Sequence, residues 1–226
     1  RGYFGAGGFG GRRSSSGSSP CWVRLPAPRV RTLWTMLTQV HGGLLTVSDL
    51  ARGLGVSFHT VQGYLDTLEA TFMVRRLPPY YANISKRLVR SPKVYLRDSG
   101  LLHRLAGLWT PGELSSWPRR GSSFEGLVIE ELAGLAADRL GRIEVCFWRT
   151  HAGAEVDLLI VAGRRMYPIE IKLAANVEAR QLTGLRSCMA DLTLRRGWVV
   201  YSGDRRVDAG GGVELVPWAA VRSGNP

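Results

Sequence analysis

Two carboxylates and a lysine in the second half of the chain have the types and spacing that phosphodiester chemistry uses. Asp157 lies in an apolar run from Val156 to Val161, which predicts a central strand covered on both faces. Glu170 and Lys172 follow on a second predicted strand, and strand alternation places them on the same face. If the two strands pair, Asp157 and Glu170 converge with Lys172 beside them.

Two converging carboxylates need a compensating positive charge. At ~4 Å they repel each other by roughly 4 kcal/mol at an effective dielectric constant near 20. Mg²⁺ relieves this repulsion, and its binding by one or two carboxylates plus substrate phosphate oxygens is common. Lys172 would then lie near the attacking water or the phosphate. The alternative is a structural ion pair of Lys172 with Asp157 or Glu170, and the motif alone does not separate the two.

Periodicity predicts the elements that position these side chains. The pattern indicates helices at 124–140 and 179–192 and strands at 144–149, 154–161, 166–172, 197–201 and 213–216. The elements up to residue 201 follow the order αβββαβ, which predicts an α/β domain with a central mixed sheet over residues 124–226. Glu125 lies on the helix that opens it.

The first half of the chain predicts a smaller domain over residues 29–108. Apolar spacing indicates three helices at 29–40, 47–54 and 58–72. Two strand-like segments follow at 73–77 and 93–96. Ser57 is placed to cap the third helix, and Asp98 to cap a later short one. Three helices followed by a two-stranded ribbon predict a winged helix-turn-helix. The Pro, Gly and Ser content of 109–123 predicts a linker.

The charge is concentrated in the first half. The chain carries a net charge of +12, and 27 of its 30 basic residues are Arg. Residues 1–30 contribute +5, residues 31–110 contribute +6 and residues 111–226 only +1. Such a surplus favours an anionic partner such as DNA. Residues 1–28 are rich in Gly, Ser and Arg and are expected to be disordered, as a terminal artefact rather than an RNA-binding tail.

The candidate DNA contacts fall into two groups. The exposed face of the third helix offers His59, Thr60 and Gln62 but no cation. The basic residues gather in and after the ribbon: Arg75, Arg76, Lys86, Arg87, Arg90 and Lys93. This distribution favours sequence-tolerant contact with the DNA backbone. The alternative is a protein-interaction or lid module.

Several classes of protein are disfavoured. No apolar run approaches the ~18 residues of a membrane helix. Three widely spaced cysteines show no metal-ligand pattern and fit a reduced, cytoplasmic setting. None of the three lysines follows a glycine, so the chain has no P-loop and is not expected to bind ATP. Because it does not begin with Met, it is interpreted as a fragment or an imperfect gene model.

The arrangement Asp157, Glu170 and Lys172 resembles the PD-(D/E)XK nuclease superfamily. Glu125 matches the additional helical acid found in many of its members, whereas Val156 stands where the eponymous proline would be. The resemblance implies a restriction-endonuclease-like domain with Asp157, Glu170, Lys172 and Glu125 as catalytic residues. It also implies Mg²⁺ held by Asp157, Glu170 and Glu125.

A longer set of strings resembles the C-terminal half of prokaryotic predicted AAA+-superfamily ATPases. They include Arg75-Arg76-Leu77-Pro78-Pro79-Tyr80, Ser91-Pro92-Lys93-Val94-Tyr95, Arg97-Asp98-Ser99-Gly100-Leu101-Leu102, Phe124-Glu125-Gly126 and Gly153-Ala154-Glu155-Val156-Asp157. The resemblance implies a winged helix, a nuclease-like domain of unknown function and a separate ATPase domain as partner. We therefore expect a DNA-binding region whose nuclease-like domain cleaves phosphodiesters with Mg²⁺, or else a non-catalytic regulatory or protein-interaction module coupled to that ATPase domain.

Overall fold

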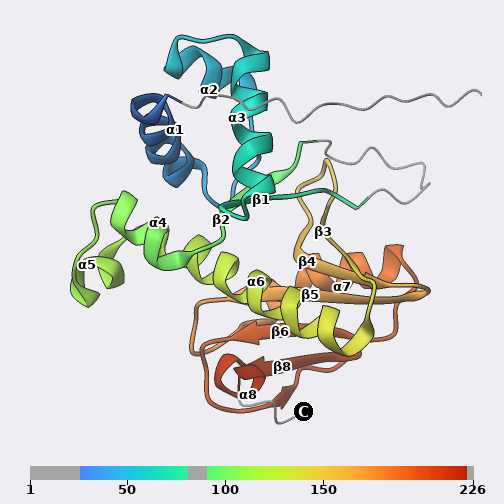
Figure 1. Ribbon diagram of the computed structural model, residues 1–226. Coiled ribbons are helices and arrows are strands. Elements are labelled where there is room, and N and C mark those ends of the chain that lie inside the picture. The colour runs from blue at the N-terminus through green and yellow to red at the C-terminus, as the bar shows by residue number, and fades with distance from the viewer. Residues whose placement is uncertain (1–25, 81–90, 223–226) are drawn as a thin grey trace, which may run out of the picture.

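A computed structural model describes residues 26–80 and 91–222, which form a mixed α+β fold. A group of helices comes first, and a sheet covered by helices follows (Figure 1). Within the described ranges, no helix combines the length and apolar character needed to cross a lipid bilayer. The mixed class matches the expectation from the sequence.

The N-terminal part consists of three helices and a two-stranded antiparallel sheet. Its elements are α1 (Ala27–Val40), α2 (Val47–Leu54), α3 (Phe58–Ala70), β1 (Val74–Leu77) and β2 (Lys93–Leu96). The Ser57 side chain accepts a hydrogen bond from the backbone N–H of Thr60 at 3.1 Å, which confirms the expected cap of α3. Gly55 ends α2 with φ of 63°, a conformation that glycine adopts without strain.

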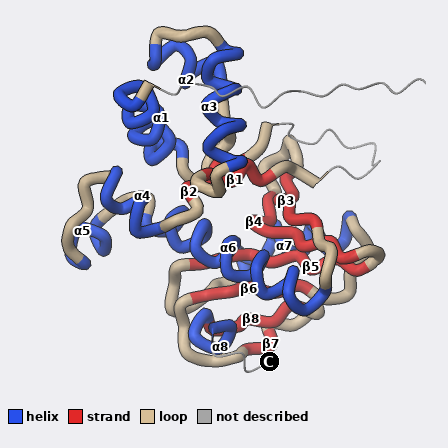
Figure 2. Tube along the Cα trace, viewed as in Figure 1, coloured by secondary structure: helices blue, strands red, loops and turns tan. Residues whose placement is uncertain are grey.

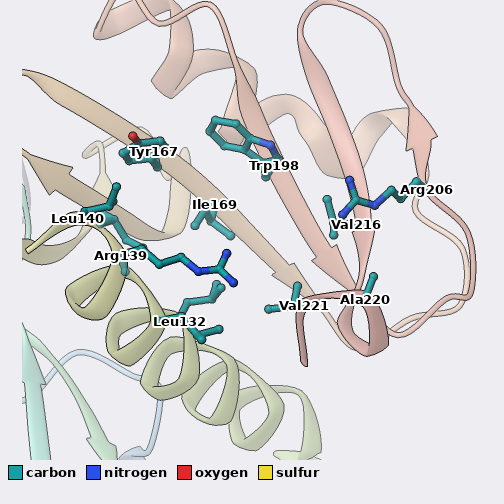
Figure 3. A pocket seen from close by; sticks show the side chains of 13 residues that line it. Leu132, Arg139, Leu140, Tyr167, Ile169, Trp198, Arg206, Val216, Ala220 and Val221 are labelled. Atoms are coloured by element: carbon teal, nitrogen blue, oxygen red, sulfur yellow. The ribbon is translucent and has the colours of Figure 1, made fainter. Parts of the chain in front are cut away.

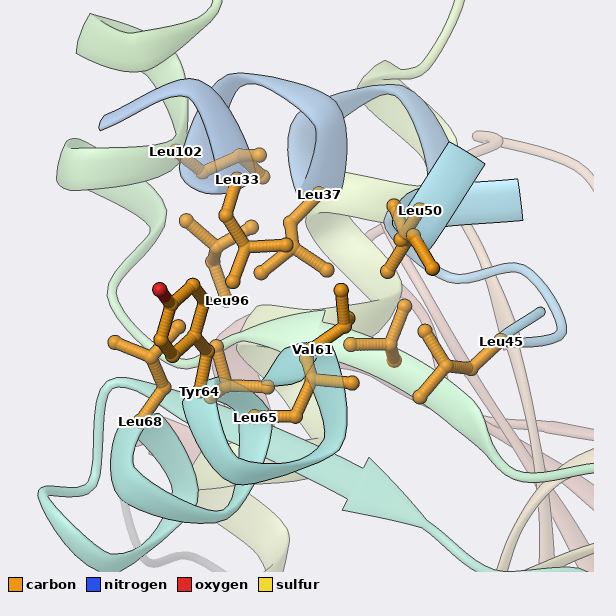
Figure 4. Packing of buried hydrophobic residues seen from close by; sticks show 13 residues of the cluster. Leu33, Leu37, Leu45, Leu50, Val61, Tyr64, Leu65, Leu68, Leu96 and Leu102 are labelled. Carbon is orange, nitrogen blue, oxygen red and sulfur yellow. The ribbon is translucent and has the colours of Figure 1, made fainter. Parts of the chain in front are cut away.

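These helices surround one apolar core. Leu33, Leu37, Val61 and Leu65 are fully buried in it, and Leu102 joins them from α4 (Ser99–Leu105) (Figure 4). Asp98 caps α4 through the N–H of Leu101 at 2.6 Å, as the sequence predicts. The core therefore fixes α4 against α1 and the two strands.

The stretch expected to be a linker, 109–123, is largely helical. It contains α5 (Pro111–Ser116) and the first turn of α6 (Arg120–Leu140). Thr110 accepts from the N–H of Glu113, and the Glu113 carboxylate accepts from the N–H of Thr110 at 2.8 Å. This capping box, together with Pro111 at the first helical position, starts α5. The stretch interpreted as a linker is therefore helical rather than irregular, because its Pro and Gly lie in the first turn of a helix.

The C-terminal part is a six-stranded mixed sheet in the order β3-β4-β5-β6-β8-β7. Its strands are β3 (Glu144–Arg149), β4 (Glu155–Ala162), β5 (Arg165–Lys172), β6 (Gly197–Tyr201), β7 (Val207–Asp208) and β8 (Val213–Pro217). β5, β6 and β8 are parallel neighbours, while β3, β4 and β7 pair antiparallel. The expected strands are present, and β7 is an additional short one.

Helices cover both faces of this sheet (Figure 2). α6 packs on one face with α8 (Trp218–Arg222), and α7 (Thr183–Asp191) packs on the other. The helix expected at 179–192 begins as a 3₁₀ turn, η1 (Ala179–Leu182), before α7. α8 was not predicted. α6 crosses the strands and brings its first turns to the edge near β2.

The two parts are joined by direct contacts. The backbone after β1 pairs with Phe147 of β3: the N–H of Tyr80 donates to the Phe147 carbonyl at 2.7 Å, and the N–H of Phe147 donates to the Pro78 carbonyl at 3.0 Å. The edge of the six-stranded sheet is therefore extended by residues from the N-terminal part.

His41, at the end of α1, is a buried connection between the two parts. Its Nδ1 accepts from the N–H of Leu96 at 3.1 Å, and its Nε2 lies 3.1 Å from the Ser122 carbonyl oxygen. These contacts require a neutral imidazole with its proton on Nε2. Burial lowers the pKa of His41 to about 4.

Acidification is expected to destabilise the fold through His41. The unfolded chain takes up this proton near pH 6.5 and the folded chain only near pH 4, so the contribution is complete above pH 6.5 and is lost on acidification towards pH 4. The loss amounts to about 3 kcal/mol. Urea unfolding of the wild type and His41→Gln at pH 7.5 and pH 4 measures it. The stability difference between them should shrink by that amount, and a pH-independent difference would contradict the prediction.

Candidate functional site: an acid cluster closed by a lysine

Asp157 lies where strands β4 and β5 separate. Their ladder includes the pair Leu158 and Ile169, and beyond it the Asp157 carboxylate accepts the N–H of Ile171 through Oδ2 at 2.9 Å. The side chain thus satisfies a backbone donor of the neighbouring strand. Asp157 is 8% exposed, so its charge is held out of water.

Glu170 and Lys172 lie together on β5, as strand alternation predicts. The Lys172 ammonium contacts Glu170 Oε1 at 2.5 Å. The other carboxylate oxygen, Oε2, is buried without a hydrogen-bond partner among the described residues. Burial, and then the neighbouring Asp157, raise the pKa of Glu170 to about 8, and Lys172 only partly opposes this.

Glu125 reaches the same region from the second turn of α6. Its Oε1 accepts from the Tyr95 hydroxyl and from the Lys93 ammonium, the latter at 3.0 Å. Burial and the charge of Asp157 raise the pKa of Glu125 to about 7, against the opposing effect of Lys93 and Tyr95. Burial and Glu125 also raise the pKa of Tyr95 well above its ordinary value, so the phenol keeps the proton that it donates.

Lys93 is the centre of this arrangement. Its ammonium contacts Glu155 Oε1 and lies 3.0 Å from Glu125 Oε1 and 3.6 Å from Asp157 Oδ1. Only 3% of the residue is exposed. Burial alone would lower the pKa of Lys93, but the three carboxylates outweigh it and raise the pKa above its ordinary value. Lys93 is therefore a buried cation at neutral pH.

We call Glu125, Glu155, Asp157 and Glu170 the acid cluster. Three cations accompany it: Lys93, Lys172 and Arg149, whose guanidinium lies 3.0 Å from Glu155 Oε2. A buried group of carboxylates is stable only when cations or protons balance it. Here the balance comes from Lys93 and from the raised pKa values of Glu125 and Glu170.

Two of the predicted magnesium ligands, Glu125 and Asp157, each have one carboxylate oxygen engaged within the protein. Glu125 already accepts from Tyr95 and Lys93, and one oxygen of Asp157 accepts from Ile171. Over residues 26–80 and 91–222, no three acidic, histidine or cysteine side chains are placed to share a metal ion. The ammonium of Lys93 lies beside two of the predicted ligands, at 3.0 Å from Glu125 Oε1 and 3.6 Å from Asp157 Oδ1.

Two family descriptions match the chain. Residues 23–111 match "Domain of unknown function (DUF8612)", and residues 120–221 match "Domain of unknown function (DUF4143)". Neither description assigns a function. The whole acid cluster lies within the DUF4143 match, whereas Lys93 and Tyr95 lie within the DUF8612 match. The site is thus shared between the two matched segments.

The similar proteins give no activity either. Uncharacterized proteins of Mycobacterium tuberculosis and Mycobacterium bovis are each 42% identical to this chain over 195 residues, covering 86% of it. The chain spans 43% of the length of these curated relatives. A crystal structure of a Vibrio cholerae protein covers 87% of this chain and 53% of its own, with 14% identity and a TM-score of 0.35.

Three cations of the DUF8612 segment that were assigned to DNA contact are engaged inside the protein. Lys93 is buried in the acid cluster, so this assignment was wrong. Arg75 forms a two-pronged ion pair with Glu130 of α6, with an Nη2–Oε2 distance of 3.0 Å. Arg76 pairs with Glu69 and, at 2.8 Å, with Asp66. Both arginines are thus engaged by acids of the protein, and their contact with DNA stays a prediction.

The remaining predicted DNA contacts are not brought together with the acid cluster. His59 is exposed on α3, Thr60 is hydrogen-bonded at the cap, and Gln62 donates to Asp66 at 3.0 Å. The predicted contacts Lys86, Arg87 and Arg90 lie outside the described residues. DNA binding by this module stays a prediction.

Sequence reasoning missed three members of the site: Tyr95, Glu155 and Arg149. Tyr95 stands two residues after Lys93, and Glu155 two residues before Asp157, so alternation would have placed each pair on one face. A lysine and a tyrosine inside an otherwise apolar strand were the usable signal.

Proposed function

We propose that this chain is the non-catalytic, regulatory part of an AAA+-like ATP-binding protein. Its winged-helix-like module and its nuclease-like domain act as one unit that responds to an ATPase domain. The observation that carries the proposal is the position of Lys93. Its side chain extends from β2 and supplies positive charge to the acid cluster in the other part. A cation contributed by one part to carboxylates of the other ties their positions together.

The chemistry of the cluster supports a coupling role. An ammonium at 3.0 Å from Glu125 and 3.6 Å from Asp157 competes for the oxygens that a divalent cation would need. The acid cluster therefore holds either the Lys93 ammonium or a divalent cation, and these are alternative states. Because the buried carboxylates lose their counter-charge when β2 moves away, such a movement is costly, and the module stays docked unless another domain drives it.

Further contacts at the same interface support it. Glu130 of α6 receives Arg75 from β1 and also Arg97, whose Nε lies 2.7 Å from Oε2. His41 bridges Leu96 and Ser122, and Phe147 pairs with the backbone after β1. Charged, polar and backbone contacts thus all fix β1 and β2 against α6 and β3. Such rigid contacts are needed if a movement of the helical module is to reach the acid cluster.

The ATPase partner rests on the family resemblance and on chain length. The chain spans 43% of its mycobacterial relatives, which leaves room in such proteins for a further domain. We infer that ATP-driven movement of that domain would act on the helical module and reach the acid cluster through β2.

A cleavage assay tests the non-catalytic assignment. We expect supercoiled plasmid incubated with the chain and Mg²⁺ or Mn²⁺ to be nicked no faster than with the Asp157→Ala or Glu170→Ala variants. The physical reason is that Lys93 holds the oxygens on which metal binding would depend. Agarose gels measure the nicked fraction over time. Nicking by the wild type that disappears in both variants would overturn the proposal.

One observation favours a metal-dependent nuclease as the second candidate. Glu170 Oε2 is a buried acceptor without a hydrogen-bond partner among the described residues, beside Asp157 and Lys172. Buried acids with strongly raised pKa values gather at functional sites. If this candidate is correct, Lys93→Met, which frees the cluster oxygens, increases nicking in the same assay.

A further inference from the structure

A cavity lies far from the acid cluster, between α6, the sheet and α8. Its volume is about 310 Å³, at the lower end of the range for small-molecule sites of ~300–1,000 Å³. Apolar side chains from all three sides form most of its wall, among them Leu132, Ile160, Ile169, Val216 and Val221 (Figure 3). Arg139 lies fourteen residues after Glu125 on α6, which separates the two sites by roughly 20 Å.

Two guanidinium groups interrupt this apolar wall. Arg139 comes from the last turn of α6, and Figure 3 shows its guanidinium directed into the space beside Ile169 and Leu132. Arg206 lines the opposite side and lies 3.4 Å from Glu214. Within the part of the chain that the structure describes, Arg139 has no carboxylate within 4.0 Å, so its positive charge is available to a ligand.

The aromatic end of the cavity limits the shape of its occupant. Tyr167 and Trp198 lie with ring centroids 5.8 Å apart at 38° and line the same space. Flat rings and aliphatic side chains favour a hydrocarbon chain as the occupant. The two arginines are then the charged groups of the lining that can bind a polar end. A ligand that matches the cavity has an apolar body and one anionic end.

We propose that this cavity binds a small amphipathic carboxylate, with a medium-chain acyl group in the cavity and the carboxylate on Arg139. Guanidinium pairs with carboxylate through two parallel hydrogen bonds, which fixes the orientation of the head group. The apolar body adds the burial of its methylene groups, each worth ~0.8 kcal/mol. The site is independent of the proposed coupling function, because it shares no residue with the acid cluster.

Decanoate is the probe that tests this assignment. Titration of the full chain, followed by calorimetry and by tryptophan fluorescence, should show saturable binding, and decanol should bind at least about tenfold more weakly. Arg139→Gln should remove most of that preference for the carboxylate. Arg142→Gln, which alters an exposed arginine outside the cavity, is the matched control and should bind decanoate as the wild type does.

A second variant separates binding in the cavity from binding elsewhere. Ala136→Trp places an indole in the cavity and should abolish binding of both compounds, while circular dichroism confirms that the variant is folded. Equal affinity of decanoate for wild type and Arg139→Gln would overturn the proposal. So would the absence of saturable binding, or a dimer in sedimentation that Ala136→Trp dissociates, because a second copy would then be the occupant.

Discussion

Replacing Lys93 with methionine is expected to lower the free energy of unfolding by about 3–5 kcal/mol at pH 8, because it leaves buried carboxylates without their cation. Methionine keeps most of the side-chain volume, so packing changes little. The ammonium that it removes contacts three carboxylates, those of Glu125, Glu155 and Asp157. Urea unfolding monitored by circular dichroism measures the difference.

Two variants show whether the loss is electrostatic. Adding Glu125→Gln to Lys93→Met removes one uncompensated charge and should restore about half of the stability, since Tyr95 can still donate to the amide oxygen. Lys172→Met is the matched control: its side chain is 28% exposed, and Glu170 can take up a proton when it is lost. A loss in Lys93→Met no larger than in Lys172→Met would contradict the central position of Lys93.

The same variant tests coupling separately from stability. Scanning calorimetry of the wild type should show one cooperative transition, because Lys93 joins the helical part to the sheet. In Lys93→Met the two parts should unfold in separate transitions. A single transition at a lower temperature would mean that Lys93 stabilises the fold without coupling its parts.

Local signals in the sequence were sufficient for much of the fold. The caps at Ser57 and Asp98 depend on residues three positions apart, and both are present. Asp157 and Glu170 were brought together correctly because a tight turn joins their antiparallel strands. The Thr110–Glu113 capping box was equally local, but the Pro and Gly inside it were interpreted only as the composition of a linker.

The position of Lys93 could not be predicted in this way. Its partner Glu125 is 32 residues away and Glu155 is 62, on elements that meet only after the two parts dock. A lysine in a basic stretch fits a phosphate contact equally well until the burial of its strand is known. The same holds for Arg75, whose partner Glu130 lies on α6.

The division of the site between two matched segments explains why neither segment alone indicates its role. The DUF4143 match holds the four acids with Arg149 and Lys172, and the DUF8612 match holds Lys93, the most deeply buried of the three cations. Considered alone, the first resembles a metal site and the second a basic surface. Together they form an interface in which the opposite charges balance. The role of the charged residues in one segment can therefore be inferred only when the other segment is packed against it.

Glutamine at position 170 is expected to make the protein less sensitive to alkali than the wild type. The folded-state pKa of Glu170, about 8, exceeds its ordinary value of 4.5, so the folded chain holds this proton longer than the unfolded chain does. The wild type therefore loses stability as the pH rises from 4.5 through 8, whereas Glu170→Gln has no such titration. Between pH 5 and pH 9 the stability of the variant relative to the wild type should rise by about 4 kcal/mol, as measured by urea unfolding.

The glutamine side chain changes the free energy of unfolding by the same amount at pH 5 and at pH 9. Comparing the two pH values therefore removes this contribution. Glu131→Gln on the exposed face of α6 is the control, and its stability relative to the wild type should not change with pH. A parallel pH dependence of wild type and Glu170→Gln would mean that Lys172 keeps Glu170 ionised in the fold. Glu170 is therefore a carboxyl group that lowers the stability of the fold at neutral pH. Residues that cost stability in this way gather at functional sites, so Glu170 is the first residue to examine if the acid cluster proves to bind metal.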